Sequence, residues 1–524
     1  MTPAVPLPAI FDEGPFAPAP RPFNLAAHAL AAADLTPGKV ALEILAGPGE
    51  VAETWTYARL RGAVLRTAGG LAALGVGPGD RLLLRIGNSA DFPLLFFAAN
   101  ALGAIPVPTS TALTPPEVAV LVEDLAPSAI LCGEGVTPPP DPMGATLLLP
   151  ADVARLRDAA PADFAATDPD DPAYILYTSG SGGRPKGVTH AQRAAWARRM
   201  MWDGWYGLTA DDRVLHAGAF NWAYTLGAGL MDPWAAGATA LIYAGPPGRG
   251  VWPALARAHG ATIFAAAPGV YRQMLDAPDL AQGFARLRHG LSAGEALPPA
   301  VAAAWTGATG KQIYEAIGMT EVSTYVSFSP ASPPVPGHVG RPQPGRRIAI
   351  LAGEGETPVA RGEEGLLAVS RRDPGLMLGY WRRPEETAAA MRGEWFVTGD
   401  RARMDASGAI AHLGRAGDLM NAGGYRVSPA EVEAALALHP GVAEAAAAEI
   451  PVRDGVTVIA AFYVPAAGPV PSEDLAAHCA ARLARYKTPR VFYPVAALPR
   501  TANGKLRRAD LAALARPGFH TASA

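Results

Sequence analysis

Short apolar runs alternate with alanine-rich stretches of helical character along the first 330 or so residues. The pattern is clear in "DRLLLRIGNSADFPLLFFAANALGAIPVPTS" (80–110). Apolar runs bounded by Gly, Pro or charged turn residues favour buried strands, and their alternation with helices is typical of α/β folds. The further strand candidates are "RVLHAGAF" (213–220), "ATALIYAG" (238–245), "ATIFAAAP" (261–268) and "KQIYEAIG" (311–318). We therefore expect an α/β fold, and no repeat of fixed period is apparent.

The pattern changes near residue 330. Residues 330–415 consist of short strand candidates and turns with few helical stretches, which predicts a small β-rich subdomain within an N-terminal domain of residues 26–415. Residues 1–25 are rich in proline and weakly patterned. We expect them to form an arm that lies on the body or is partly disordered.

Glycines cluster in "GRAGDLMNAGGY" (414–425), just before a clear helix start. In "SPAEVEAAL", Ser428 can cap the helix and Glu431 completes the capping box. We expect a hinge at residues 416–418 and a small, mobile α+β domain at residues 419–524. The predicted fold class is α/β, with a large N-terminal region of α/β subdomains and a small β-rich subdomain, followed by that C-terminal domain.

Composition excludes several functional classes. Lys and Arg total 44 and Asp and Glu total 47, a formal net charge of −3, so no overall field would draw the chain to nucleic acid or to an anionic membrane. No uncharged apolar run reaches about 18 residues, and the N-terminus lacks a basic segment followed by an apolar one. Cys132 and Cys479 have no CxxC spacing, so we interpret them as packing residues in a reducing compartment. We expect a soluble cytoplasmic protein, monomeric or homodimeric, without membrane insertion.

One loop carries candidate chemistry: "YTSGSGGRPKG" (177–187) follows the apolar run "AYIL". Its glycines would let a phosphate approach the backbone, its hydroxyls and amides would donate hydrogen bonds, and Lys186 would add charge. A P-loop needs Ser or Thr after the lysine, where Gly187 stands, and a dinucleotide GxGxxG motif fails at Pro185. Taken alone, the loop could equally be an ordinary glycine-rich turn.

The loop resembles the phosphate-binding signature of the acyl-adenylate-forming superfamily, which includes acyl-CoA synthetases, luciferases and peptide-synthetase adenylation domains. Further motifs of that family follow in the family's order. They are "SAGEALP" (292–298), "YEAIGMTE" (314–321), "TGD" (398–400), "GRAGD" (414–418), "GGYRVSPAEVE" (423–433) and "PRTANGK" (499–505). Because the set is ordered and spans nearly the whole chain, the sequence is identified as a member of that superfamily.

The resemblance implies a site for ATP and Mg²⁺. Thr320 would donate to the α-phosphate, and Glu321 would hold the magnesium ion. Lys186 would be a nearby cation. The residues that would hold the β- and γ-phosphates are Thr178, Ser179, Gly180, Ser181, Gly182 and Gly183. The alternative for residues 320–321 is a solvated Thr–Glu pair without a ligand.

The same resemblance implies a nucleoside site. Asp400 would accept hydrogen bonds from both ribose hydroxyls, and Arg415 would add a donor beside it. Glu315 stands where the family usually places an Asn or Asp facing the adenine amino group. The residues that would surround the base are Gly294, Glu295, Ala316 and Ile317. Because Ile317 occupies the place of a common tyrosine, adenine would rest on an aliphatic face.

The resemblance also implies a reaction in two steps. Lys505, in the turn "TANGK", would bridge the carboxylate and α-phosphate oxygens while an acyl-AMP and pyrophosphate form. Coenzyme A, held by Gly423, Gly424 and Tyr425, would then attack the acyl carbon and release AMP. Rotation of the C-terminal domain would exchange Lys505 for the thiol-binding loop between the steps, and no protein nucleophile would be needed.

For the acid, "FNWAYTLG" (220–227) aligns with one wall of the acyl pocket of benzoate-CoA ligase-type enzymes. The residues that would line this pocket are Trp222, Ala223, Tyr224, Gly318, Thr324 and Tyr325. The structural alternative for the aromatic members is core packing. Nothing cationic in this set would pair a second carboxylate. We expect a small aromatic or a short- to medium-chain aliphatic monocarboxylate.

Two alternatives remain open at this stage. One is a stand-alone ligase that loads a carrier protein instead of CoA. The other is a non-catalytic nucleotide-binding homologue, because Gly182 replaces a usual hydroxyl residue of the phosphate loop and Gly417 replaces an acidic residue common at the interdomain pivot. Pyrophosphate exchange separates the non-catalytic protein from an enzyme.

Overall fold

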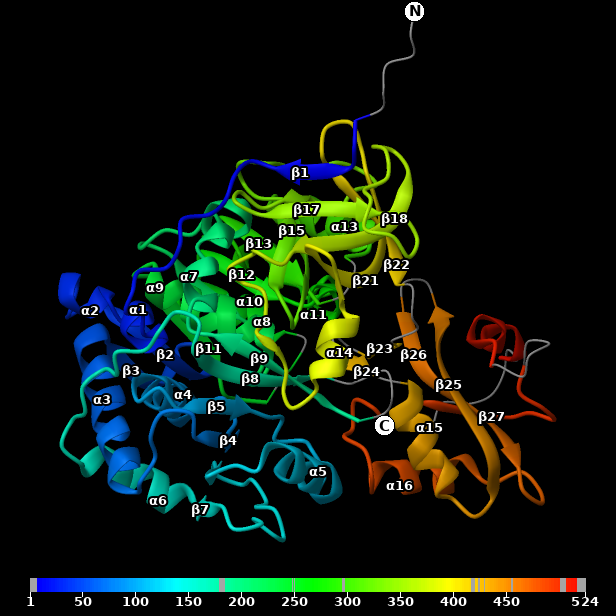
Figure 1. Ribbon diagram of the computed structural model, residues 1–524, viewed down its shortest axis with the longest axis horizontal. Coiled ribbons are helices and arrows are strands. Elements are labelled where there is room, and N and C mark those ends of the chain that lie inside the picture. Colours follow the sequence, from blue (N-terminus) through cyan, green and yellow to red (C-terminus); the bar gives the residue numbers. More distant parts are fainter. Residues whose placement is uncertain are drawn as a thin grey trace, which may run out of the picture.

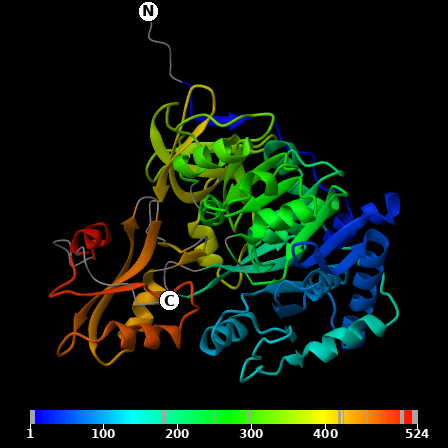
Figure 2. The ribbon, with the colours of Figure 1, turned by 180° about the vertical axis from the view of Figure 1, so that it is seen from behind.

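The computed structural model describes residues 7–178, 184–246, 248, 250–294, 297–415, 420–422, 425–427, 429–453, 456–499 and 506–515. Figure 1 shows a large body, made of the described residues up to 415, beside a smaller C-terminal unit, made of those from 420 to 515. The view from behind shows the same two parts (Figure 2). In these ranges, no helix is long and apolar enough to cross a membrane. The predicted fold class is confirmed.

A central sheet in the body contains nine of the described strands. Its inner strands run parallel, and β10, β11 and β12 are buried almost throughout. Burial of both faces explains why these strands read as continuous apolar runs in the sequence. In order across the sheet they are β16 (Arg341–Pro342), β15 (Ser323–Ser327), β14 (Ile313–Met319), β13 (His289–Ala293), β12 (Ile263–Ala266), β10 (Arg213–His216), β11 (Thr239–Tyr243), β2 (Val40–Gly47) and β3 (Glu50–Thr56).

Two smaller sheets complete the α/β part of the body. One is parallel, in the order β5 (Ile105–Pro108), β4 (Arg81–Arg85), β6 (Ala129–Cys132) and β7 (Thr146–Leu148). The other contains β19 (Gly379–Tyr380), β9 (Lys186–Ala191) and β8 (Pro172–Thr178). Strands β8 and β9 pair antiparallel, with Thr178 opposite Lys186, so the two ends of the predicted phosphate loop are adjacent.

The β-rich part of the body is a third layer of antiparallel strands. It consists of β1 (Ile10–Asp12), β17 (Arg347–Leu351), β18 (Glu364–Ser370), β21 (Trp395–Met404), β20 (Met391–Arg392) and β22 (Ile410–Arg415). Strand β1 pairs with β17, so the described part of the N-terminal arm lies on the body, as Figure 1 shows in blue.

Helices cover the sheets and bury apolar side chains against them. Helix α3 begins after Thr56, whose hydroxyl accepts from the Arg59 amide, and α5 begins at a capping box of Thr114 and Glu117. The helices of the body are α1 (Leu25–Ala29), α2 (Ala32–Leu35), α3 (Tyr57–Ala73), α4 (Asp91–Ala101), α5 (Pro115–Leu125), α6 (Pro150–Arg155), α7 (Ala194–Ala197), α8 (Ala223–Leu226), α9 (Asp232–Ala235), α10 (Val251–Ala258), α11 (Pro268–Met274), α12 (Leu280–Gly283), α13 (Pro299–Thr309) and α14 (Pro384–Ala389).

The C-terminal unit has its own hydrophobic core, which includes Val432, Leu436 and Leu475. Its elements are the hairpin β23 (Met420–Ala422) and β24 (Tyr425–Val427), helices α15 (Pro429–Ala437) and α16 (Ser472–Ala480), and the sheet of β25 (Val442–Arg453), β26 (Val456–Pro465) and β27 (Val491–Pro494). Helix α15 is the helix predicted from "SPAEVEAAL". The hinge residues 416–418 and Ser428 lie outside the described residues, and the domain boundaries stay predictions.

Candidate active site

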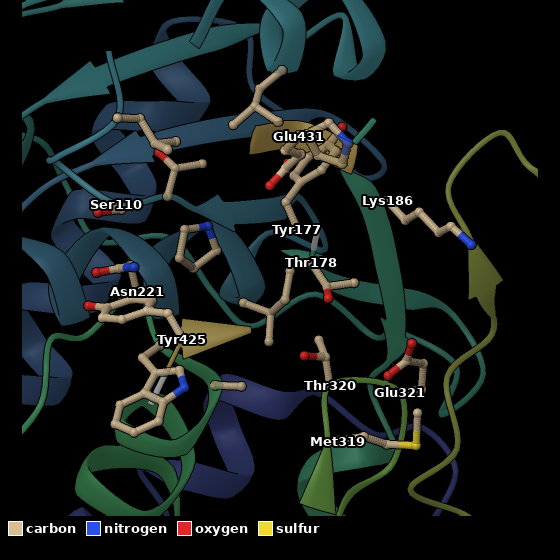
Figure 3. A pocket seen from close by; sticks show the side chains of 18 of the residues that line it. Ser110, Tyr177, Thr178, Lys186, Asn221, Met319, Thr320, Glu321, Tyr425 and Glu431 are labelled. Carbon is tan, nitrogen blue, oxygen red and sulfur yellow. The ribbon is translucent and has the colours of Figure 1, made fainter. Parts of the chain in front are cut away.

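A cavity of about 930 Å³ lies between the body and the C-terminal unit. Its lining comes from strand ends and loops of the body, including the β8–β9 hairpin and the turn between β14 and β15, and from α5 and α8. The C-terminal unit contributes Tyr425, residues of α15, and Arg482, Leu483, Tyr486 and Lys487. Figure 3 shows Thr178, Thr320 and Tyr425 in this pocket. The structure therefore brings together segments that lie more than 300 positions apart in the sequence.

The phosphate side of the cavity contains Thr178 and Lys186. The Lys186 ammonium lies 2.5 Å from a Glu386 carboxylate oxygen and 5.0 Å from the centre of the Tyr380 ring. Figure 3 shows its side chain extending away from Thr178 and Thr320. Lys186 is thus held by an ion pair at the edge of the cavity. The other residues predicted to bind the phosphates, Ser179, Gly180, Ser181, Gly182 and Gly183, lie outside the described residues.

Thr320 and Glu321 follow strand β14 and line the same cavity. The Thr320 carbonyl accepts a hydrogen bond from Nε2 of buried His190 at 2.8 Å, and Oε1 of Glu321 accepts from the Tyr380 hydroxyl at 2.8 Å. Burial lowers the pKa of His190 to about 4, so its ring is neutral at pH 7. His190 and Tyr380 fix the positions of the predicted catalytic pair. Sequence reasoning missed His190 and Tyr380, because they lie outside the motif of residues 314–321 that they support.

Asp400 and Glu315, the residues predicted to bind the nucleoside, are absent from the cavity lining, although Thr398 and Gly294 belong to it. Asp400 is almost fully buried, and its Oδ1 lies 3.4 Å from Nε2 of His412. Asp400 lies opposite Arg415 in the strand register, and Thr398, two residues before it, lines the cavity. A buried carboxylate next to a histidine and an arginine position is a suitable acceptor for hydroxyl groups.

Glu315 accepts a hydrogen bond from the Leu297 amide at 2.7 Å. Burial raises the pKa of its carboxyl to about 7, although that bond acts in the opposite direction. Gly294 lines the cavity at a positive φ of 97°, which glycine adopts without strain. Ala316 and Ile317 pack into hydrophobic clusters and are absent from the cavity lining, and Glu295 lies outside the described residues.

Five of the six residues predicted to form the acyl wall line one cavity. Trp222, Ala223, Tyr224, Gly318 and Thr324 line the cavity. Gly318 is required there, because a Cβ at that position would lie 2.8 Å from the Ser323 carbonyl oxygen. Tyr325 is fully buried in the core of the β-rich part and is not in the lining. Tyr325 follows Thr324 in strand β15, and the side chains of these two residues face opposite sides.

Sequence reasoning missed a polar group in the same wall. Arg198, Trp205 and Tyr206 line the cavity, and the Arg198 guanidinium forms an ion pair of 2.6 Å with Asp232. Although burial acts against it, the carboxylate keeps the pKa of Arg198 above its ordinary value. None of the residues predicted for the acyl wall from the sequence is cationic, and Arg198 was not among them. The signal was weak, because Arg198 is one of several arginines in "RAAWARRM".

The C-terminal unit meets the body through a few specific contacts. The Tyr425 ring stacks on Tyr486 at 4.0 Å and on Trp222 of the acyl wall at 6.3 Å between ring centres. The Lys487 ammonium lies 3.1 Å from Glu117 of α5 and 3.6 Å from Glu431 of α15. Tyr425, predicted to bind CoA, therefore borders the cavity, whereas Gly423, Gly424 and Lys505 lie outside the described residues.

Comparison with known proteins identifies the family of the chain. The AMP-binding enzyme family model matches residues 30–381, and the model of the AMP-binding enzyme C-terminal domain matches residues 431–505. The benzoate–CoA ligase of Thauera aromatica is 34% identical over 499 residues, covering 89% of this chain and 93% of that protein.

Two solved structures share 28% sequence identity with the chain but differ in similarity of shape. A double mutant of the o-succinylbenzoate CoA synthetase of Bacillus subtilis, bound to a product analogue, has a TM-score of 0.82 and covers 93% of this chain and 98% of its own. An anthranilate CoA ligase in complex with anthranoyl-AMP has a TM-score of 0.71 and covers 94% and 98%. The chain therefore belongs to the AMP-binding enzyme family, and within it to the AMP-forming acid–CoA ligases.

Proposed function

We propose that the protein joins a small aromatic monocarboxylate to CoA through an acyl-AMP, with release of pyrophosphate and AMP. The observation that carries this proposal is the single cavity in which Thr178 and Thr320, the aromatic wall around Trp222, and Tyr425 of the C-terminal unit all meet. ATP, acid and thiol need adjacent sites, and such a cavity supports all three.

The ATP site uses residues of the body. Thr178 and the loop after it, with Ser179, Gly180, Ser181, Gly182 and Gly183, cradle the β- and γ-phosphates. Thr320 donates to the α-phosphate, and Lys186 leaves Glu386 to approach the phosphates. Asp400 and Arg415 hold the ribose, and Glu315 accepts from the adenine amino group.

Glu321 fits a magnesium ion. Its carboxylate offers hard oxygen ligands beside the phosphate side, and Tyr380 occupies only Oε1, while Oε2 has no donor among the described residues. Mg²⁺ is commonly bound by one or two carboxylates together with substrate phosphates. When bound, the ion neutralises part of the charge on the phosphate oxygens.

The first step is attack of the substrate carboxylate on the α-phosphorus, which breaks the bond to pyrophosphate. Lys505 bridges the two reacting oxygens, and Thr320, held by His190 through its carbonyl, keeps the α-phosphate in line. The aromatic side chains of the acyl wall help to exclude water from the mixed anhydride.

In the second step the CoA thiol attacks the acyl carbon, and AMP leaves. The contacts of Tyr425 and Lys487 place the C-terminal unit over the cavity, as this step requires. The TM-score is higher with the structure bound to a product analogue than with the acyl-AMP complex. This supports the proposal that the C-terminal unit lies in the position of the second step. Gly423 and Gly424 then border the thiol path.

The test is ATP–pyrophosphate exchange over a panel of aromatic and aliphatic acids, with CoA consumption and AMP release measured in parallel. We expect exchange with small aromatic acids and one AMP per CoA consumed. Thr320→Val and Glu321→Gln should lower exchange by about 100-fold, whereas Glu354→Gln, on an exposed turn of the β-rich part, should leave it unchanged. Absence of exchange with every acid would contradict the proposal, and exchange without CoA turnover would indicate a carrier protein as acceptor.

A further inference from the structure

Arg198 enters the acyl wall from the segment after helix α7. Its guanidinium fits there because residue 227 is glycine: a Cβ at that position would lie 1.9 Å from Nη2. The side chain of Arg198 is 7% exposed and that of Asp232 is 3% exposed. The polar group is thus built into the buried part of the wall rather than lying at the cavity mouth.

Within the described ranges, the hydrogen bonds of the Arg198 guanidinium leave one of its donors free. Arg198 donates from Nε and Nη2 to both oxygens of Asp232, from Nη2 to the Tyr206 hydroxyl at 3.1 Å, and from Nη1 to the Ser323 hydroxyl at 2.6 Å. A guanidinium has five N–H bonds. The second N–H of Nη1 therefore has no acceptor in the described part of the chain.

The hydroxyl groups nearby are unequally satisfied. Tyr206 donates to Asp232 at 2.7 Å. The Ser323 hydroxyl accepts from Arg198, and its only other hydrogen bond among the described residues is a weak one to the Met201 sulfur at 3.9 Å. Tyr224 lines the same wall, and its buried hydroxyl has no partner in the described ranges. A polar group of the ligand is the natural partner for these atoms, because unsatisfied buried donors are costly.

The charges define which polar group fits. Asp232 neutralises Arg198 through two oxygens, so the site as a whole has no net charge. A second carboxylate on the acid would be buried without a counterion, which is strongly unfavourable. An uncharged hydroxyl can accept from Nη1 of Arg198 and exchange a hydrogen bond with Ser323.

We propose that Arg198 and Ser323, with Asp232 and Tyr206 holding the guanidinium, form a subsite for an uncharged hydroxyl substituent, so that the substrate is a hydroxylated aromatic monocarboxylate rather than the unsubstituted acid or an aromatic dicarboxylate. This inference rests on the proposed function. It assigns to the acyl wall a polar specificity that its aromatic residues do not provide.

The first experiment compares benzoate, 3-hydroxybenzoate, 4-hydroxybenzoate and isophthalate in ATP–pyrophosphate exchange with the wild-type enzyme. A hydrogen bond to a charged donor changes selectivity by about 10- to 100-fold. We expect kcat/KM for the better hydroxybenzoate to exceed that for benzoate by at least about 10-fold and that for isophthalate by more. Equal values for benzoate and both hydroxybenzoates would overturn the subsite but leave the proposed function intact. No exchange with any acid would instead contradict the proposed function.

Two variants test the residues. Ser323→Ala should reduce the preference for hydroxybenzoate over benzoate by about 10-fold. Its matched control is Ser327→Ala on the same strand, which removes a buried hydroxyl bonded to the Gly204 carbonyl outside the cavity and should keep the wild-type ratio. An equal loss of preference in both variants would show a general effect of strand β15 and would overturn the role of Ser323.

The variant Asp232→Asn tests whether the charge balance between Arg198 and Asp232 excludes a second carboxylate, because it should increase activity toward isophthalate. The substitution leaves Arg198 without its counterion, so isophthalate should improve relative to 3-hydroxybenzoate by about 10-fold or more. Misfolding cannot produce such a change in ratio. A folded variant that still rejects isophthalate as strongly as the wild type would show that Arg198 does not face the acid.

Discussion

The two walls of the cavity are held in different ways. The body wall combines strand ends of a nine-stranded sheet with the Arg198–Asp232 ion pair, in which both side chains are less than 10% exposed. The wall from the C-terminal unit rests on the Lys487–Glu117 pair, the contact of Tyr425 with Trp222, and a hydrogen bond of 3.4 Å from the Thr114 hydroxyl to the Arg482 carbonyl. One wall is continuous with a core, and the other is a set of separate contacts.

This difference indicates a division of labour. Side chains fixed by sheet register and buried hydrogen bonds can select the acid, because their positions vary little. Contacts of a few side chains can be broken and remade at low cost, so the C-terminal wall suits a part that changes between half-reactions. Tyr425 and Trp222 are the point where the two walls touch.

The largest expected effect concerns Lys505 of the C-terminal unit. Lys505→Ala should lower acyl-AMP formation by about 1,000-fold but leave thioester formation from supplied acyl-AMP nearly intact, because the lysine serves only the first step. Single-turnover measurements of the two half-reactions check this. Lys311→Ala, outside the cavity lining, is the control. Equal loss of both half-reactions would contradict the division of labour.

The next effect concerns Glu315 in strand β14 of the body, whose pKa is raised to about 7 by burial. The folded state holds this proton more tightly than the unfolded state, where the pKa is about 4.3, so stability falls as pH rises from about 4.5 to 7 and is level above. The loss should be about 2 kcal/mol, after allowance for residual solvent contact. Urea unfolding of wild type and Glu315→Gln at several pH values measures it. Parallel pH dependences in the two proteins would contradict the assignment.

Trp222→Ala tests the contact between the walls. It should shift the preference toward bulkier acids by about 10-fold and lower stability by about 2 kcal/mol, since the side chain is only half-buried. The acid profile and thermal unfolding give the two readouts. Trp252→Ala, a half-buried tryptophan outside the cavity, should lower stability without changing the profile. If both variants behave alike, Trp222 is a packing residue.

The smallest expected effect comes from Glu117→Gln. Glutamine can still accept from the Thr114 amide at the start of α5, but it carries no negative charge to attract Lys487. Thioester formation should slow by about 5-fold with little change in pyrophosphate exchange. Glu363→Gln, which changes a carboxylate that accepts from the Ala360 amide away from the cavity, is the matched control. An equal slowing of both half-reactions would mean that the ion pair supports the fold rather than one conformation.

Sequence reasoning predicted the fold class and the positions of Thr178, Thr320, Trp222 and Tyr425 at one site. The fold class follows from local features, because continuous apolar runs indicate buried parallel strands. The grouping of the four residues at one site was instead implied by the resemblance to the family. It is harder to predict from the sequence which side chains of a strand face the cavity and which face the core. The register of β14 and β15 shifts between Ile317 and Gly318, and the sequence alone did not indicate that Thr324 faces the cavity while Tyr325 faces the core.

The sequence by itself determined the family motifs, the α/β and α+β units and the chemistry that their residues can perform. Only the tertiary structure decided the partners: Arg198 with Asp232, Lys186 with Glu386, and Glu117 with Lys487 across 370 positions. The physical reason is that a charged side chain can pair with any opposite charge that approaches it, and burial decides how strong that pair is. Approach and burial are properties of the packed chain, so no local pattern records them.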